Sequence, residues 1–295
     1  MISSKFLHCD NQYLKLVNTI LRYGEWKKGR NANTLSYFGY KMRFCLKDNK
    51  VPFLTTKKLA WKSCLKELLW FINGQTDNKI LTNQNVSIWN GNASKDFLFS
   101  RGLSYPIEGD LGPVYGHQWR HFNAKYNDCN TNYTGKGVDQ LKYVIENLNN
   151  EEEKFSRRLI LSAWNPQQLD EMALPPCHVM SQFNVSPSNE LSCLVFQRSG
   201  DVGLGVPFNI ASYGMLTHLL AKHCNLKVGS LVHILGDAHI YENHIDALKK
   251  QRTRDFYDMP TININKKTNI DDYIFSDFKI MNYKFHPTIK MDMIA

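Results

Sequence analysis

The chain has 295 residues, a formal net charge of +9 and an ordinary globular composition in which 43% of residues are hydrophobic. That length suffices for one large α/β domain or two small ones, and the lack of any run of about 18 apolar residues argues against a membrane span. The lysines and arginines are scattered, which favours a small anionic ligand over nucleic acid, because nucleic-acid-binding charge usually clusters on one face.

The N-terminus and the cysteines bear on location. Residues 1–10 lack the long apolar core of a secretory signal. Seven cysteines occur without a C-x-x-C pair, which fits a reducing compartment and argues against a zinc ribbon. We therefore expect a cytoplasmic protein with no metal site.

The first half of the chain alternates helical and strand patterns. Apolar residues at helical spacing predict helices over 11–23 and 59–72, with Gly24 and Gly74 as stops. Aromatic and β-branched residues predict a strand over 34–46. Residues 25–33 are predicted to be a loop, either a solvated turn or a mobile basic loop over an anion. Residues 73–112 are predicted to be rich in loops, and 138–148 to be helical.

The second half is richer in strands. Residues 159–164 are predicted to form a buried strand, and 177–186 and 191–197 to form a hairpin around a turn at 187–190. A long helix is predicted over 208–224, a strand over 230–235, a further helix starting at 236, and late strands at 261–264 and 278–280. No segment has the composition of a linker, so we predict a single α+β domain over residues 1–295, with helices covering one face of a mostly β layer.

Four chemically useful side chains lie within about forty residues: Cys177, Arg198, Asp201 and Asn209. A thiol becomes a useful nucleophile as thiolate, which a fixed positive charge favours. Arg198 keeps its charge, and its guanidinium suits phosphate. Two prolines before Cys177 can hold a loop rigidly at the start of a strand. The pattern indicates a cysteine that attacks a ring or a carbonyl in a phosphorylated substrate.

Other residues permit two interpretations. His178 either orients its neighbours or is a core histidine, since adjacent strand residues face opposite sides. Glu67 on an apolar helix needs a partner or a task. Trp89 either fills a gap or stacks on a ligand. Arg157 and Arg158 either stay solvated or reach into a neighbouring subunit.

Eight motifs together point to a family. They are TLSYFG (34–39), LTTK (54–57), ELLWF (67–71), GDLGPVYG (109–116), PCH (176–178), QRSGD (197–201), PFNIASY (207–213) and GDAHIY (236–241). In this order, and over essentially the whole chain, they resemble the folate-dependent thymidylate synthases, in particular the eukaryotic branch with its viral members.

The resemblance implies reductive methylation of dUMP to dTMP, with 5,10-methylenetetrahydrofolate as cosubstrate and no metal. Cys177 would add to carbon 6 of uracil. Asn209 would hydrogen-bond to the oxygen on carbon 4 and to the neighbouring ring N–H, and water and Glu67-linked hydrogen bonds would hold the Asn209 side chain in orientation. Glu67 would relay protons, and Tyr115, through water, would help to remove the carbon 5 proton.

The resemblance also implies two sets of ligands. The substrate set comprises Arg30, Arg157, Arg158, Gln197, Arg198, Ser199, Gly200, Asp201, Asn209, His239 and Tyr241, with His239 and Tyr241 on the ribose. The folate set comprises Ile72, Trp89, Asn90, Asp201, Leu204, Gly205, Phe208 and Ile294, and Asp201 counts among the catalytic residues as well. Arg157 and Arg158 would cross the interface of a homodimer, and residues 291–295 would close over the folate.

Three departures from the family pattern concern binding. Residues 29–36 read GRNANTLS, one residue shorter than the usual DRTGTGTLS, which affects Arg30. Asn90 stands where an acidic residue commonly follows the tryptophan. The chain ends Ile294-Ala295, a tail that keeps the size and apolar character of the lid.

Other functions fit the same motifs less well. A dUMP or dCMP hydroxymethylase would use water in place of hydride, whereas Asn209 favours uracil and Trp89 favours the reductive outcome by shielding the intermediate. A basic RNA-binding protein or an inactive dimeric scaffold would not need Cys177, Arg198 and Asn209 together.

Overall fold

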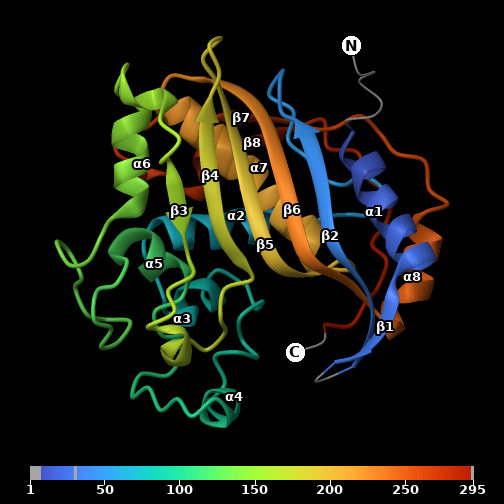
Figure 1. Ribbon diagram of the computed structural model, residues 1–295, viewed down its shortest axis with the longest axis horizontal. Coiled ribbons are helices and arrows are strands. Elements are labelled where there is room, and N and C mark those ends of the chain that lie inside the picture. Colours follow the sequence, from blue (N-terminus) through green and yellow to red (C-terminus); the bar gives the residue numbers. More distant parts are fainter. Residues whose placement is uncertain (1–7, 30–31, 294–295) are drawn as a thin grey trace.

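The structure is a computed structural model that describes residues 8–29 and 32–293. Its centre is a six-stranded sheet in the order β1-β2-β6-β5-β4-β3, accompanied by a two-stranded sheet of β7 and β8 (Figure 1). The strands are β1 (Glu25–Lys28), β2 (Asn33–Cys45), β3 (Ile160–Ser162), β4 (His178–Val185), β5 (Glu190–Asp201), β6 (Lys227–Tyr241), β7 (Thr261–Ile264) and β8 (Phe278–Met281). The α-helices are α1 (Cys9–Tyr23), α2 (Trp61–Ile72), α3 (Asn78–Thr82), α4 (Lys95–Ser100), α5 (Tyr115–His121), α6 (Gln140–Leu148), α7 (Gly205–His223) and α8 (Ile245–Gln251). The predicted α+β class is confirmed.

All neighbouring strands of the large sheet run antiparallel except β5 and β6, which are parallel. Parallel strands need a crossover, and α7 supplies it. In Figure 1, α7 and α2 lie behind the sheet, and α7 packs against β5, β6 and α2. The N-terminus of α7 therefore comes next to the end of β5, where Asp201 and Asn209 lie.

Helix α7 is buried on nearly every side, from Val206 to Ala221. A helix that is apolar all round belongs in a core. Gly200 permits its close approach to the sheet, since a Cβ there would lie 2.8 Å from Val206 Cγ2 and 3.0 Å from Leu235 Cδ2. A larger residue at 200 would therefore displace the helix that carries Asn209.

For two segments the predicted type of secondary structure was wrong. Residues 25–28 form strand β1, not a loop, because they pair antiparallel with residues 33–36 of β2. The predicted helix from residue 236 is instead the end of β6, which continues to Tyr241 because both β2 and β5 pair with it there. The remaining predicted boundaries shift by a few residues, as element ends commonly do.

The described helices include none with both the length and the apolar character needed to cross a bilayer.

Candidate active site

Cys177 lies immediately before β4, half-buried, at the end of the two-proline loop. Its backbone N–H donates to Tyr115 Oη at 2.7 Å, and its carbonyl accepts from the backbone N–H of Arg198 at 2.8 Å. Burial raises the pKa of the Cys177 thiol, and the positive charge of Arg198 opposes that shift. The two-proline loop thus leads into a strand, and the Arg198 guanidinium lies near enough for its charge to act on the thiol.

Arg198 holds the loop that carries the thiol. Its Nε donates to Pro176 O at 2.9 Å and its Nη2 to Pro175 O at 3.0 Å, while the guanidinium carbon lies 5.5 Å from the centre of the Trp164 ring. A guanidinium has five N–H donors, so donors remain for an anion after these two bonds. One side chain thus fixes the cysteine loop and supplies positive charge beside the sulfur.

A chain of four polar side chains runs through the core behind Cys177. His233 Nε2 lies 2.8 Å from Gln197 Oε1, Gln197 Nε2 donates to Asn209 Oδ1 at 3.0 Å, and Asn209 Nδ2 lies 2.9 Å from His178 Nε2. Burial lowers the pKa of His178 to about 4 and of His233 to about 3, so both rings are neutral at pH 7. The neutral Nε2 of His178 accepts from Asn209, which leaves the second N–H of Asn209 for a ligand.

These hydrogen bonds bear on two questions that the sequence left open, the role of His178 and the orientation of Asn209. His178 is buried and also orients Asn209, so both interpretations of it hold. Gln197 and His178 hold the carboxamide of Asn209 directly, and the expected link to Glu67 through water stays a prediction. The Glu67 carboxylate, on α2, accepts a hydrogen bond from Trp89 instead.

Glu67 and Trp89 are connected to Cys177 through Tyr115. Trp89 Nε1 donates to Glu67 Oε1 at 2.7 Å, and the Trp89 ring lies edge-on to Tyr115, centre to centre at 6.1 Å. Burial raises the pKa of Glu67 to about 7, against the opposing bond from Trp89. Burial also raises the pKa of Tyr115 well above its ordinary value, so its hydroxyl keeps its proton. Glu67, Trp89, Tyr115 and Cys177 are therefore contiguous.

Asp201, at the end of β5, anchors the turn into α7. It accepts from the backbone N–H of Gly203 at 2.8 Å and of Leu204 at 3.3 Å. A Cβ on Gly205 would lie 3.7 Å from Asp201 Cβ and 3.8 Å from Asn209 Oδ1, so Gly205 sits between these two side chains. Leu204 and Phe208, both half-buried, flank the same turn, which brings the predicted folate residues near Asp201 and Asn209.

The C-terminal segment reaches this turn through His244. His244 Nε2 lies 2.8 Å from Asp292 O, and its Nδ1 lies 3.6 Å from Asp201 Oδ1. Lys57 Nζ donates to Gly203 O, and burial lowers the pKa of Lys57 to about 8, with Asp201 opposing the shift. Asp201 is thereby linked to both the LTTK motif and the end of the described chain.

His239 and Tyr241 lie at the end of β6, alternating with buried residues. Their rings meet edge to face at 5.3 Å. Asp237, two residues earlier, lies 3.2 Å from His239 Nδ1 through its Oδ1. Ser199 of β5 pairs with Asp237 across the parallel ladder, so the predicted ribose and phosphate residues share one end of the sheet.

Several predicted residues are not joined to this group by any described contact. Arg157 and Arg158 are exposed just before the edge strand β3. Ile72 is fully buried, and the Asn90 side chain accepts from Asn78 and Thr82 at 3.0 and 3.1 Å. Arg30 and Ile294 lie outside the described residues.

Sequence reasoning gave no role to four polar residues that the structure places at the site: Lys57, His233, Asp237 and His244. Lys57 and Asp237 occur inside the quoted motifs, which was a usable signal. His233 and His244 are isolated in the sequence, and only strand register and the packing of the C-terminal segment bring them to Gln197 and Asp201.

A thiol on an arginine-braced loop, followed by a histidine that is bonded to an oriented carboxamide, is the arrangement expected of a cysteine-dependent α+β enzyme. The family model described as "Thymidylate synthase" matches residues 11–295. The chain is 52% identical to human thymidylate synthase over 288 residues, covering 97% of this chain and 91% of that protein. It is 49% identical to the Saccharomyces cerevisiae thymidylate synthase, with 96% of each chain covered. The chain belongs to the thymidylate synthase family.

Longer relatives match equally well. The bifunctional dihydrofolate reductase-thymidylate synthase of Paramecium tetraurelia is 51% identical over 97% of this chain, which spans 61% of that protein. The corresponding protein of Zea mays is also 51% identical, and the chain spans 54% of it.

Proposed function

We propose that this chain catalyses the reductive methylation of dUMP to dTMP with 5,10-methylenetetrahydrofolate. The observation that carries the proposal is that Arg198 bonds to Pro176 and Asn209 to His178, the residues before and after Cys177, with Asn209 also held by Gln197. A uracil with a phosphate tail offers what these groups bind: an anion, an electron-poor carbon and a carbonyl oxygen. The family membership supports the same substrates.

In the first step the Cys177 sulfur bonds to carbon 6 of the ring. The electron pair of the carbon 5–carbon 6 double bond moves toward carbon 5 and the oxygen on carbon 4, which makes carbon 5 nucleophilic. Arg198 favours the thiolate that this step needs, against the burial that raises the pKa of Cys177.

Asn209 stabilises the charge that develops on the oxygen of carbon 4. One of its N–H groups is bonded to His178, so the other is the donor for that oxygen. A donor fixed before the reaction costs no reorganisation when charge develops. The carbonyl of Asn209 accepts from Gln197 and has a second lone pair for the ring N–H of uracil.

Proton transfers fall to Glu67 and Tyr115. A carboxyl group whose pKa is about 7 can gain or lose a proton at neutral pH, as a general acid–base catalyst must. Tyr115 keeps its proton, so it acts through a water bonded to its hydroxyl when the carbon 5 proton leaves. Trp89 covers this side and keeps bulk water from the reacting carbon.

The residues around the start of α7 fit a pterin. Trp89, Leu204 and Phe208 offer apolar surface for a flat ring, and the Asp201 carboxylate accepts hydrogen bonds from ring N–H groups. When bound there, the folate supplies both the carbon and the hydride and leaves as dihydrofolate. The last residues would cover it, through the contact of His244 with Asp292.

The nucleophile is tested by Cys177→Ser. A hydroxyl without a strong adjacent base is a far weaker nucleophile than a thiolate, so turnover, followed by dihydrofolate absorbance, should fall by several orders of magnitude while dUMP still binds. Cys45→Ser, which alters a half-buried cysteine on β2, is the matched control. Retention of more than about a tenth of the turnover by Cys177→Ser would refute the assignment.

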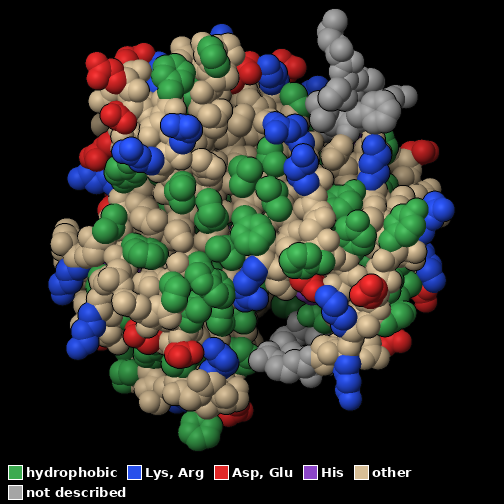
Figure 2. Space-filling view, in the orientation of Figure 1, with side chains coloured by type: hydrophobic (Ala, Val, Ile, Leu, Met, Phe, Trp, Pro, Cys, Tyr) green, Lys and Arg blue, Asp and Glu red, His purple; other side chains and the backbone are tan. Residues whose placement is uncertain are grey.

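We also propose a homodimer formed through the outer face of the large sheet. Parallel strands are usually covered on both faces, yet in Figure 1 no described helix crosses in front of β2, β6, β5 and β4. Hydrophobic side chains gather over these strands in Figure 2; register pairs Leu194 with Val232 and Phe196 with Ile234 there.

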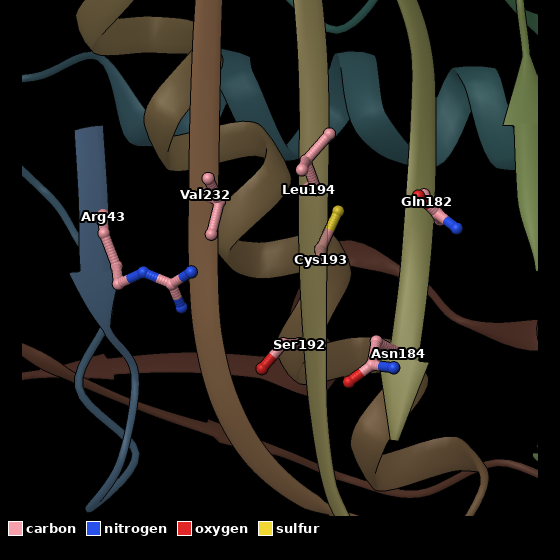
Figure 3. A pocket seen from close by; sticks show the side chains of 7 residues that line it. All are labelled: Arg43, Gln182, Asn184, Ser192, Cys193, Leu194 and Val232. Atoms are coloured by element: carbon pink, nitrogen blue, oxygen red, sulfur yellow. The ribbon is translucent and has the colours of Figure 1, made fainter. Parts of the chain in front are cut away.

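A hollow of about 260 Å³ on this face suits side chains of a second copy (Figure 3). Arg43 lies at one border, Gln182 and Asn184 at the other, and Leu194 and Val232 between them. A mixed apolar and polar surface of this kind is typical of subunit interfaces. The exposed Arg157 and Arg158 would then reach the partner's substrate phosphate.

Complementation between subunits tests the sharing of sites. Arg157→Ala mixed with Cys177→Ser should regain activity, because one site of each heterodimer would carry neither change. Subunit exchange is verified by differently tagged proteins. If exchange is complete and activity does not return, the arginines act within their own subunit.

We further propose a cytoplasmic location, which the seven unpaired cysteines support. Fractionation of cells that produce the tagged chain would test it, and recovery in an organelle or secreted fraction would refute it.

A further inference from the structure

Asp237 has three polar neighbours but no part in the chemical steps above. Its Oδ1 lies 3.2 Å from His239 Nδ1. Its Oδ2 accepts from Ser36 Oγ and from Lys27 Nζ, both at 2.8 Å, and Lys27 also donates to Ser36 at 3.1 Å. The side chain is one-third exposed, so the contacts lie at the border of the site.

Strand pairing explains why these groups meet. Asp237 and His239 are two residues apart on β6 and so project from the same face. Ser36 of β2 pairs with His239, and Lys27 of β1 pairs with Thr34. One carboxylate therefore joins β6 to both strands of the β1–β2 hairpin, which leads to the segment around Arg30.

The ionised carboxylate of Asp237 determines which ring nitrogen of His239 carries the hydrogen. The hydrogen bond from His239, with those from Lys27 and Ser36, holds the pKa of Asp237 well below its ordinary value, so the group is ionised and only accepts. His239 Nδ1 must then carry a hydrogen. In the neutral ring Nε2 is left with a lone pair, which can accept but not donate.

We propose that Asp237 is a positioning residue that fixes His239 in the Nδ1–H tautomer, so that Nε2 accepts a hydrogen bond from the ribose 3′-hydroxyl of the nucleotide. The proposal rests on the proposed function, in which His239 and Tyr241 bind the ribose. It adds that the enzyme recognises the 3′-hydroxyl as a donor, and that Asp237 acts on the substrate only through the imidazole.

The tautomer can be observed without any ligand. Two-bond ¹⁵N–¹H correlation spectra of the wild-type protein at pH 8, with His239 assigned from a His239→Gln variant, should show a protonated Nδ1 and an unprotonated Nε2. A protonated Nε2 in the wild type would overturn the proposal, whatever the substrate of the enzyme is.

A binding cycle then measures the link to the ribose. Calorimetry with dUMP and with 2′,3′-dideoxyuridine monophosphate gives the penalty for losing the hydroxyl, which should be about threefold to tenfold in Kd for wild type. In Asp237→Ala the penalty should fall to no more than half of the wild-type factor, because the ring is no longer held. An undiminished penalty in Asp237→Ala would overturn the proposal.

Matched variants separate this link from general damage. Asp246→Ala removes an almost fully exposed carboxylate on α8 and should leave both Kd values unchanged. Ser36→Ala keeps Asp237 and its bond to His239 and should keep the penalty. If Asp237→Ala does not fold, as judged by circular dichroism, Asp237→Leu, which keeps the bulk of the side chain but has no acceptor, replaces it with the same required fall. If wild type does not bind dUMP at all, the proposed function fails, and the spectra still decide the tautomer.

Discussion

Two buried carboxylates in different regions of the molecule differ in how many hydrogen bonds they accept. Asp10, in the first turn of α1, is fully buried and accepts from the backbone N–H and the hydroxyl of both Thr55 and Thr56, at 2.6–3.1 Å. Glu67, on α2, is 7% exposed, and among the described residues its hydrogen-bond donor is Trp89 alone.

The number of donors separates a structural carboxylate from one available for chemistry. Buried charge is tolerated when it is fully hydrogen-bonded, and Asp10 thereby joins α1 to the LTTK segment. His8, Cys9 and Asp10 present ligand atoms within 4.8 Å of one another, but the Asp10 oxygens are already occupied by these donors. Glu67 has capacity left, and burial raises its pKa to about 7, as is common for functional groups.

Glu67→Gln should give the largest effect. The amide keeps the size of the side chain and can accept from Trp89, but it cannot exchange a proton, so kcat should fall about 10²–10⁴-fold. Stability at pH 8 should stay equal or rise, because a neutral group costs less to bury. Dihydrofolate absorbance and urea denaturation measure the two quantities, with the exposed Glu108→Gln as control. A matching loss of several kcal/mol in stability would put Glu67 in the same class as Asp10.

Asp10→Ala should reduce stability and leave kcat almost unchanged. Four donors lose a charged acceptor, and unfolding should become easier by about 3–5 kcal/mol, whereas kcat per folded site should change by less than about twofold. Urea denaturation at fixed protein concentration and titration of active sites check this. A folded Asp10→Ala protein with strongly reduced kcat would show that the segment at 54–57 transmits its position to the site.

The pH dependence of stability gives a direct test of the raised pKa of Glu67, the less hydrogen-bonded of the two carboxylates. The folded-state pKa of Glu67 is raised to about 7 from 4.5, so the folded protein holds this proton more tightly than the unfolded chain. The contribution of Glu67 is therefore fully present below pH 4.5 and is lost as pH rises through 7. The difference in unfolding free energy between wild type and Glu67→Gln should fall by about 3 kcal/mol from pH 4.5 to pH 8. A constant difference would mean that Glu67 is not perturbed.

Trp89→Phe should have the smallest effect. It removes the donor that opposes burial, so the pKa of Glu67 should rise further, by about one unit or less. The ionisation seen in the pH dependence of kcat should move to higher pH, with a change of only a few-fold at neutral pH. Trp61→Phe, which stacks between Phe53 and Phe275, is the control, and equal shifts in both variants would disprove the specific link.

Much of the fold was predictable because the spacing of apolar residues within a segment indicates which of its sides is buried. The helices that became α1, α2, α6 and α7 and the β4–β5 hairpin follow from such patterns, and Glu67 was conspicuous as a charge on an apolar helix. Cys177 and Arg198 were identifiable since loop chemistry and charge are also local properties.

Pairing between strands was not predictable in this way. Strand β1 is short and exposed throughout, with three charged residues and Trp26, so nothing in its own pattern distinguishes it from a loop until β2 pairs with it. The end of β6 contains Gly236 and Asp237, which are rare in strands, yet ladders on both sides keep it extended. The partners of Asn209, Gln197 and His178, are brought together by the register of β4 and β5, which single residues do not encode.

The hydrogen-bonded chain through His178, Gln197, Asn209 and His233 also has a kinetic consequence. Its members come from β4, β5, α7 and β6, and its bonds span 31, 12 and 36 residues of sequence. Contacts of such long range form late, after the entropy of loop closure has been overcome. During refolding, helical signal should therefore return before activity does, and no partly active species should accumulate, because the Asn209 carboxamide is oriented only when β4, β5 and β6 have paired and α7 has packed on them.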